Sequence, residues 1–296
     1  MLPSAEAEEQ AIGIAGSGPV AQAFGKSLIE CGIRIHYIAS REMDHAQAAA
    51  MFLGDGVRAV SYRGLASYVS HVIIAVSDRA INPVAEDLAR ARGKLRVALH
   101  TCGSYGAEVL APLGAAGVSC GAIHPLQTIR DAKSGARDLR NAAFAISGDS
   151  AALGWAEEIA TVLSGTIVRI KPDGRLFYHA AAVMASNYIA ALLDSAEGLM
   201  LMAGVPKKDA LRALGPLARA ALENVLQNGA VEALTGPVAR GDAATVAAHT
   251  QALQATESSI ATLYEAAGLC ALRMARARGL NEDQAENVRR ALTGRR

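Results

Sequence analysis

The chain has 296 residues, of which 51% are hydrophobic and 19% are charged, and its formal net charge is +1. This length suits two domains, and this composition supplies a large apolar core, which excludes general disorder. The near-neutral balance offers no basic surface that would attract nucleic acid or an anionic membrane, so neither is expected as a partner.

Targeting features are not found in the sequence. The first ten residues, MLPSAEAEEQ, are acidic where a secretory signal would be basic, and no apolar signal segment follows them. The most apolar long stretch, 179–205, contains histidine, asparagine and acidic residues, so we expect a buried helix and not a membrane span. The four cysteines are widely spaced and offer neither a disulfide framework nor metal-ligand spacing. These features predict a cytoplasmic protein without a metal site.

Short β-rich runs alternate with helical stretches in the first half of the chain. The predicted strands are 11–15, 33–39, 57–61, 72–76, 95–100, 118–123, 144–147 and 166–170. Helical spacing is found at 19–31, 44–53, 79–92 and 107–116. This alternation predicts an α/β fold with a doubly wound, mostly parallel Rossmann sheet.

The pattern changes after residue 171, where the strand signals stop. Helical patterns rich in Ala and Leu follow at 175–203, 207–228, 243–266, 270–278 and from 282 onward. We therefore predict an α/β domain over residues 1–171 and an all-α domain over residues 172–296.

A glycine-rich turn, Gly16-Ser17-Gly18-Pro19-Val20-Ala21, lies between the first predicted strand and the first predicted helix. In this G-x-G-x-x-A pattern the glycines let a pyrophosphate approach backbone N–H groups at a helix N-terminus. A plain tight turn is the alternative for the pattern alone, but its position within a βαβ unit favours dinucleotide binding. Gly16, Ser17, Gly18, Pro19 and Val20 are therefore predicted to contact the cofactor.

The residues after the second predicted strand bear on the choice of dinucleotide. An NAD enzyme usually has an acidic residue there for the ribose 2′-hydroxyl, whereas this chain has Ser40 and Arg41. A hydroxyl and a guanidinium suit a 2′-phosphate, so this pair favours NADP. The argument for NAD is that Arg41 is an ordinary solvated residue next to Glu42.

Polar residues follow three further predicted strands, at the sheet edge where ligands bind in doubly wound folds. We predict cofactor contacts from Val76, Ser77 and Thr101 and a substrate contact from Cys102. His124 follows the next strand, and it can exchange a proton near neutral pH, as hydride transfer at a carbinol carbon requires. The alternative for His124 is a structural histidine bonded to a nearby carbonyl.

The helical half also contains polar residues in apolar surroundings. His179 and Asn187 fall on one stripe of a predicted helix, where they either face a substrate or form a hydrogen-bond network between helices. Thr235 and Arg240 lie in the Gly- and Pro-containing segment 234–242, which either presents donors to an anionic substrate or is a turn between helices.

Several motifs occur here in combination. They are the glycine loop, His-Thr-Cys-Gly at 100–103, His-Pro-Leu-Gln at 124–127, Tyr-His-Ala-Ala-Ala at 178–182, Ser-Asn-Tyr at 186–188 and the segment 234–242. The combination resembles a family that joins a Rossmann-like NADP-binding domain to a helical C-terminal domain of unknown function. That family is similar to the 6-phosphogluconate dehydrogenase-like group, which includes ketopantoate reductase, pyrroline-5-carboxylate reductase, prephenate dehydrogenase and deazaflavin-dependent NADP oxidoreductases. The resemblance implies an NADP-dependent oxidoreductase that forms a homodimer through its helical domain.

The resemblance also bears on the proton donor. The His-Pro at 124–125 is similar to that of prephenate dehydrogenases, in which the histidine meets the reacting hydroxyl. Ketopantoate reductases have a catalytic lysine four residues before an asparagine on this helix, but the residue four before Asn187 is Val183. The resemblance therefore leaves the proton to His124 or His179.

From these residues we expect an NADPH-dependent reductase of a small, anionic carbonyl acid. Under this hypothesis, Asn187 together with Thr235 or Arg240 would orient the substrate. Reduction of a cyclic imine is a second enzymatic hypothesis, and a non-catalytic NADP-binding sensor protein is the alternative from another class.

Overall fold

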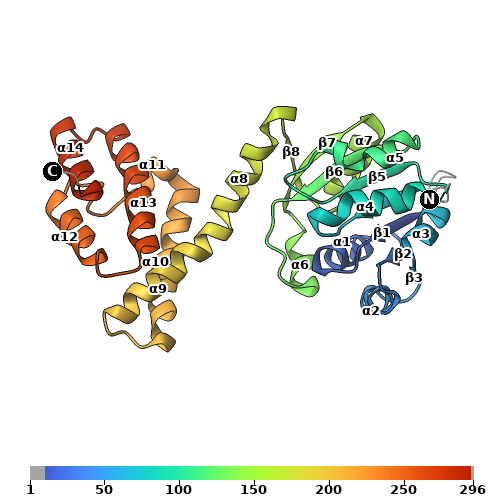
Figure 1. Cartoon of the computed structure of the whole chain (residues 1–296), viewed down its shortest axis with the longest axis horizontal. Helices are drawn as coiled ribbons and strands as arrows, with labels where there is room; N and C mark the ends of the chain where they lie inside the picture. Colours follow the sequence, from blue (N-terminus) through green and yellow to red (C-terminus); the bar gives the residue numbers. More distant parts are fainter. Residues whose placement is uncertain (1–10, 92, 295–296) are drawn as a thin grey trace. The chain divides into compact units, whose positions relative to one another are not determined.

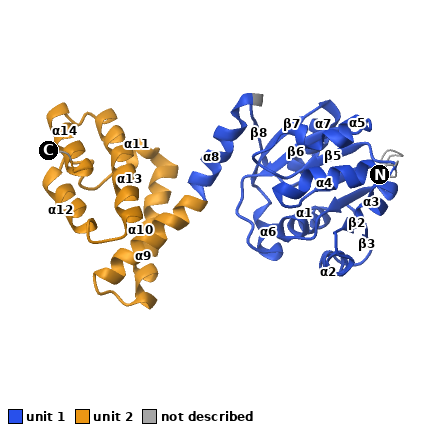
Figure 2. Cartoon of the chain, in the orientation of Figure 1, with its two compact units in different colours: residues 1–186 blue, residues 187–296 orange. Residues whose placement is uncertain are grey.

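The computed structural model describes residues 11–91 and 93–294 (Figure 1). The prediction that the chain has no secretory signal rests on the first ten residues, which lie outside the described residues. The chain divides into two units, residues 1–186 and 187–296 (Figure 2). The boundary predicted at residue 171 falls between the last strand and helix α8 (Arg175–Ala185), which lies in unit 1.

Unit 1 is built on an eight-stranded sheet in the order β3-β2-β1-β4-β5-β6-β7-β8. The strands are β1 (Ile12–Ala15), β2 (Ile35–Ala39), β3 (Arg58–Val60), β4 (His71–Ile74), β5 (Val97–His100), β6 (Ser119–Pro125), β7 (Ala143–Gly148) and β8 (Thr166–Arg169). Neighbouring strands are parallel, except that β7 runs antiparallel to β6. The predicted doubly wound, mostly parallel sheet is confirmed.

The central strands are apolar because helices cover both faces of the sheet. All residues of β1, β4 and β5 are buried. Alternate residues of β4 enter different clusters, since Ile73 packs with Phe24 on one face and its neighbours Val72 and Ile74 pack with Leu65 on the other. The helices of this unit are α1 (Pro19–Glu30), α2 (Met43–Leu53), α3 (Tyr62–Tyr68), α4 (Asp78–Ala89), α5 (Ala111–Ala115), α6 (Ala132–Asp138), α7 (Ser150–Val162) and α8, with short 3₁₀ turns at Ala107–Leu110 and Pro172–Gly174.

Three of these helices, α3, α6 and α7, were not among the predicted ones. Each begins with a side-chain cap, in which Ser61, Asp131 or Asp149 accepts a hydrogen bond from a backbone N–H of the first turn. Asp149 also accepts a hydrogen bond of 2.8 Å from the backbone N–H of Cys120 on β6. The cap residues could have been recognised from the sequence. The hydrogen bond between Asp149 and Cys120, which joins α7 to β6, could not, because it depends on the sheet.

Unit 2 is entirely helical, as predicted. Its helices are α9 (Asn187–Met202), α10 (Lys207–Asn228), α11 (Ala230–Ala233), α12 (Ala243–Leu253), α13 (Ser258–Ala277) and α14 (Glu282–Thr293). A small core joins residues of the last helices with Val238. Both predicted helices 243–266 and 270–278 are helical, but the break between them was placed wrongly. Thr256 Oγ1 donates a hydrogen bond of 2.7 Å to the carbonyl of Leu253 where α12 ends, and α13 then continues unbroken to Ala277.

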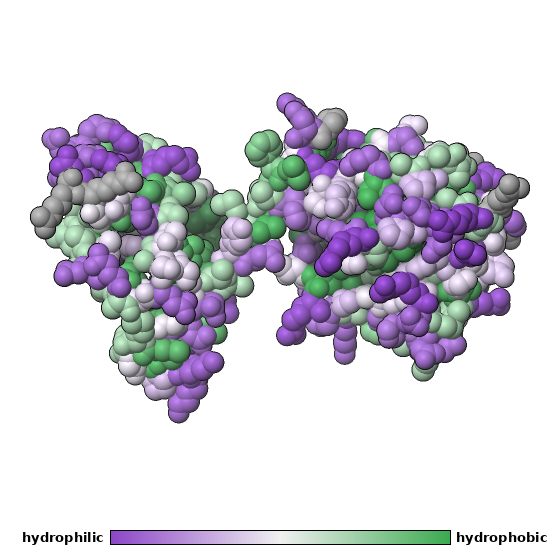
Figure 3. Space-filling view, viewed as in Figure 1, coloured by the Kyte–Doolittle hydropathy of each residue, from purple (hydrophilic) through white to green (hydrophobic). Residues whose placement is uncertain are grey.

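The predicted helix 175–203 is also wrong in one respect. It breaks at Ser186, where φ is −130° and ψ is −74°, and so forms α8 and α9. The expected burial of 179–205 is not found in the single chain, because α9 has no buried residue and the only buried residue of α8 is Arg175. The stretch Arg175–Met202 has the length and composition of a membrane span, since an 18-residue window within it has a mean hydropathy of 1.4. Figure 3 shows hydrophobic residues at the surface of both units.

Candidate active site

A cavity of about 560 Å³ lies in unit 1 at the carboxyl ends of β1, β2, β4, β5 and β6. Parallel strands bring the turns that follow them to one edge of the sheet, which explains why residues far apart in sequence meet there. All ten predicted cofactor contacts line this cavity: Gly16, Ser17, Gly18, Pro19, Val20, Ser40, Arg41, Val76, Ser77 and Thr101. Cys102, His124 and His179 line it as well.

The two glycines of the loop are needed for different physical reasons. Gly16 has φ of +129°, and a Cβ there would lie 2.1 Å from the carbonyl oxygen of Ala75, so the protein itself requires glycine. Gly18 has φ of −75° and ψ of 178°, and a Cβ there would meet no atom within 4 Å. Since neither backbone strain nor packing calls for glycine at 18, the clear space before the N-terminus of α1 fits an approaching pyrophosphate.

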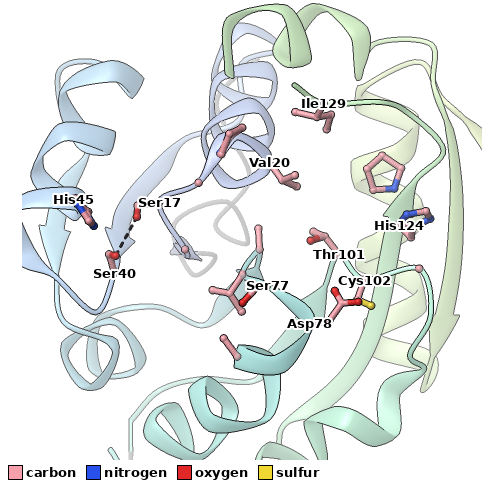
Figure 4. Close-up of a pocket in the computed structure, with 18 of the residues that line it drawn as sticks. Ser17, Val20, Ser40, His45, Ser77, Asp78, Thr101, Cys102, His124 and Ile129 are labelled. Atoms are coloured by element: carbon pink, nitrogen blue, oxygen red, sulfur yellow. Dashed lines mark hydrogen bonds between the residues drawn. The ribbon is translucent and has the colours of Figure 1, made fainter. Parts of the chain in front are cut away.

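Hydroxyl and cationic groups gather at the end of β2. Ser17 Oγ donates a hydrogen bond of 3.0 Å to Ser40 Oγ, which joins the glycine loop to the strand end (Figure 4). Arg41 and His45 line the same part of the cavity with Tyr62 of α3. Burial raises the pKa of Tyr62, and the Arg41 guanidinium near it acts in the opposite direction. This donor set fits a 2′-phosphate, although Glu42 also lines the cavity.

The opposite side of the cavity contains Thr101, Cys102 and His124 (Figure 4). His100, which ends β5, is fully buried and shapes the loop beneath them. Its Nδ1 accepts a hydrogen bond of 3.2 Å from the N–H of Cys102, and its Nε2 lies 2.9 Å from the carbonyl of Gly106. Burial lowers the pKa of His100 to about 4, so the ring is neutral and its Nε2–H donates to that carbonyl.

Cys102 has a protonated thiol. Its Sγ lies 3.1 Å from Ser104 Oγ, which donates to Asp78 Oδ2 at 3.5 Å. Burial raises the pKa of the Cys102 thiol, and the Ser104 hydroxyl opposes this effect. A thiol held in this way contacts a ligand as a small, weakly polar group and is no thiolate nucleophile.

His124 pairs with a tyrosine that the sequence did not single out as a site residue. Its Nδ1 lies 2.6 Å from the Tyr178 hydroxyl, and the centroids of its ring and the His179 ring are 6.3 Å apart. A Cβ on Gly103 would lie 2.8 Å from His124 Nε2, which shows how closely the loop backbone approaches the imidazole. Burial lowers the pKa of His124 to about 4, and His179 and Arg175 act in the same direction. The ring is therefore neutral at pH 7.

A buried cation lies at the start of α8. Arg175 is 9% exposed; it donates from Nη2 to Ser147 Oγ, and its Nη1 is buried without a hydrogen-bond partner among the described residues. Burial raises the pKa of Tyr178 to about 12, and the nearby Arg175 guanidinium opposes that increase. Arg175, Tyr178 and His179 are spaced as i, i+3 and i+4, so they lie on one face of the helix.

Three predicted substrate residues belong to unit 2. Asn187 is the first residue of α9, and Thr235 and Arg240 lie between α11 and α12. The Leu234 carbonyl in this turn accepts a hydrogen bond of 2.6 Å from Arg278. Asp242 then caps α12 by accepting a hydrogen bond of 3.0 Å from the N–H of Thr245. These contacts give the turn a structural role within unit 2, and its role toward substrate stays a prediction.

Comparisons with known families fit this geometry. Residues 11–99 match the model described as NADP oxidoreductase, coenzyme F420-dependent, and residues 142–270 match a domain of unknown function, DUF2520. The comparison with curated proteins gives no match. The fold and the glycine-lined cavity are thus those of a Rossmann-like domain of the NADP oxidoreductase type. More specifically, the chain combines an NADP oxidoreductase domain with a DUF2520 domain, as the sequence resemblance implied.

Solved structures share the fold over nearly the whole chain. A Thermotoga maritima protein has 24% identity and a TM-score of 0.72, covering 90% of this chain and 99% of its own. A Bacteroides fragilis structure named as an NADP oxidoreductase has 21% identity and a TM-score of 0.68, covering 92% and 98%. Plasmodium falciparum pyrroline carboxylate reductase, solved with NADP bound, has 12% identity and a TM-score of 0.60, covering 96% and 98%. These TM-scores establish a shared fold and, at identities this low, the fold alone.

Proposed function

We propose that the protein is an NADPH-dependent reductase of a small carbonyl acid. The observation that carries this proposal is one continuous cavity, with phosphate-type donors at the end of β2 and an imidazole at the end of β6. A cyclic imine is a second substrate class, and it is favoured by the shared fold with pyrroline carboxylate reductase.

The residues that would hold NADPH follow from the cavity. Gly18 admits the pyrophosphate and Gly16 allows the tight turn before it. Ser40 and Arg41 hold the 2′-phosphate, and Thr101 lies on the side where the nicotinamide would be held. Bound NADPH would supply a hydride to the substrate carbon.

The substrate oxygen or nitrogen must gain a proton when its carbon is reduced. His124 is the group we assign to that transfer, because its ring lines the cavity and its Nδ1 is already engaged by Tyr178. His179 lies beside it and is the second candidate. We retain Asn187, Thr235 and Arg240 as proposed substrate-orienting residues, with the last two suited to an anionic group.

The test is NADPH oxidation against a panel of 2-keto acids and cyclic imines, with NADH and coenzyme F420 as competing redox partners. For a substrate that turns over, His124→Asn should lower kcat/KM by at least about 100-fold, the scale of general acid catalysis, while the Kd for NADPH stays within about twofold. The matched control is His249→Asn, which removes a histidine paired with a tyrosine (Tyr264, 2.9 Å) outside the cavity. Tight NADPH binding without turnover on any substrate would support the sensor hypothesis instead.

We also propose that the protein is a homodimer, because the single chain leaves an unusual amount of apolar surface uncovered. In unit 2, Leu217 and Leu226 of α10 are 68% and 76% exposed, and Leu192 of α9 is 46% exposed. A second copy that covers these helices would also supply the burial that the apolar stretch 179–205 led us to expect. Since all four cysteines are free, we place the dimer in the cytoplasm, where thiols stay reduced.

The oligomeric state can be measured by sedimentation equilibrium. Leu226→Glu should convert the dimer to monomers, because a charge in an apolar interface is costly to bury. Met51→Glu is the control, since Met51 is 84% exposed on α2 of unit 1. A monomeric wild-type protein, or one that partitions into lipid vesicles, would contradict the dimer.

A further inference from the structure

We infer that Tyr178 is a positioning residue that fixes the tautomer of His124, directs its Nε2–H into the cavity and supplies a proton to Nδ1 during the reaction. The tautomer does not depend on the substrate, whereas the proton transfer rests on the proposed reductase function.

The hydrogen bond between the two side chains defines the donor. Among the described residues, His124 Nδ1 is the hydrogen-bond partner of the Tyr178 hydroxyl, at 2.6 Å. Bonds donated by N–H groups centre near about 2.9–3.0 Å, whereas O–H donors give shorter ones near about 2.7–2.8 Å. We assign the phenol O–H as the donor, because a separation of 2.6 Å is shorter than N–H donors usually give. If Nδ1 accepts, the proton of the neutral ring is on Nε2.

The edge of the ring that carries Nε2 lies beside the loop at Gly103. His124 lines the cavity, and its Nε2 lies 2.8 Å from the place where a Cβ on Gly103 would be. Glycine at 103 thus leaves this ring edge uncovered from the loop side. The rings of His124 and Tyr178 meet edge to face at 89°, with centroids 5.6 Å apart, so both side chains are held in position.

A neutral imidazole needs such a partner to act as an acid. The charged and titratable groups around His124 are His179, Tyr178 and Arg175 on α8, Asp78 on α4 and His100 on β5. Asp78 favours the imidazolium form of His124, whereas burial, His179 and Arg175 oppose it. A neutral ring that gave up its Nε2 proton without replacement would become an imidazolate. A second proton arriving at Nδ1 avoids that anion, and Tyr178 is the group in place to give it.

The proton transfers can be written in balance. As the substrate carbon receives hydride, the π pair of its C=O or C=N bond moves to the heteroatom, which takes the Nε2 proton of His124. The O–H bond of Tyr178 breaks and an Nδ1–H bond forms, which leaves a phenolate close to the buried Arg175 guanidinium. Return of the Nδ1 proton to the phenolate and uptake of one solvent proton at Nε2 restore the starting state.

Nuclear magnetic resonance of the full-length protein tests the tautomer without substrate or cofactor. With ¹⁵N-labelled histidine at pH 7, two-bond ¹H–¹⁵N correlations should show His124 protonated at Nε2, with assignment from His124→Asn. Tyr178→Phe should give a mixture of both tautomers. The matched control Tyr264→Phe, which alters the His249 pair, should leave the His124 signals unchanged. A wild-type ring protonated at Nδ1, or an unchanged tautomer in Tyr178→Phe, would overturn the assignment.

Kinetics then test the proton supply. Tyr178→Phe should lower kcat at least about tenfold, with KM and the Kd for NADPH within about twofold, because the substituted group acts on the proton and not on binding. An unchanged kcat would refute the relay. If no substrate is reduced by the wild-type protein, the proposed function fails while the tautomer result stands by itself.

Discussion

The two glycines of the nucleotide loop provide a sharp test of the cofactor site. Gly16→Ala and Gly18→Ala each add one methyl group, two residues apart, but the structure assigns the additions to different partners. The methyl at 16 meets the Ala75 carbonyl oxygen at 2.1 Å and sits on a backbone with φ of +129°. The methyl at 18 meets no protein atom within 4 Å. The first substitution should therefore damage the fold, and the second should damage only nucleotide binding.

The magnitudes follow from these contacts. A non-glycine residue in such a backbone region costs about 1–3 kcal/mol. Together with the clash we expect Gly16→Ala to lose at least about 3 kcal/mol of unfolding free energy, or about 6–12 °C in Tm. In Gly18→Ala, alanine is a poorer N-cap than glycine and lowers the stability of α1, but it also lowers the conformational entropy of the unfolded chain. These two effects oppose each other, so Tm should stay within about 3 °C of the wild-type value. The methyl group should remove one charge-assisted hydrogen bond to the phosphate, which contributes about 1.5–3 kcal/mol, and so raise the Kd for NADPH about 10–100-fold.

Thermal unfolding and NADPH fluorescence titration of the two variants measure these quantities. A Gly18→Ala protein that binds NADPH within about twofold of wild type would refute the position of the pyrophosphate. A Gly16→Ala protein as stable as wild type would show that the backbone reasoning at this turn is wrong.

Three further predictions concern residues that line the cavity or support it. Arg41→Ala should raise the Kd for NADPH about 10–100-fold and that for NADH less than threefold, because it removes a charge-assisted interaction of about 1.5–3 kcal/mol with the 2′-phosphate. Equal increases for both nucleotides in fluorescence titrations would exclude Arg41 as the 2′-phosphate ligand. Because the pKa of His100 falls from 6.5 to about 4 on folding, unfolded chains take up the proton first as the pH drops. The free energy of unfolding should therefore fall by about 3 kcal/mol between pH 6.5 and pH 4. Urea unfolding at several pH values should show a smaller decrease for His100→Asn than for the wild type. Gly103→Ala should displace the His124 ring and lower kcat at least about tenfold with NADPH affinity retained, whereas an unchanged kcat would show that the ring position is not critical.

Much of the fold and of the cofactor half of the site follows from local sequence. Strand and helix periodicity is a property of neighbouring residues, so the alternation before residue 171 and the helices after it were predictable. The boundaries were less so, because the break at Ser186 and the end of α12 depend on single backbone angles and caps. Ser17, Ser40 and Thr101 were predictable as cavity residues because parallel strands place their carboxyl ends on one edge.

His45 could have been found as a cavity residue, because it lies in the first turn of α2, which directly follows β2. Tyr62 could not be assigned to the cavity, since nothing in its own segment shows that α3 approaches the end of β2. The same limit applied to α9, whose apolar sequence predicts burial but cannot say which molecule covers it.

By itself the sequence determined the glycine loop, the Ser40–Arg41 pair and the position of His124 near the end of a strand, since each depends on residues adjacent in the chain. The strand was predicted to end at residue 123, whereas β6 continues to Pro125 and includes His124, because both residues pair with β7. The tertiary structure decided what surrounds His124. Tyr178 is 54 residues away in sequence, and it reaches Nδ1 only because α8 carries it back to β6, next to β7, which runs antiparallel to it. Burial at that junction is what holds the imidazole neutral, and burial is a property of the packed molecule and not of the segment.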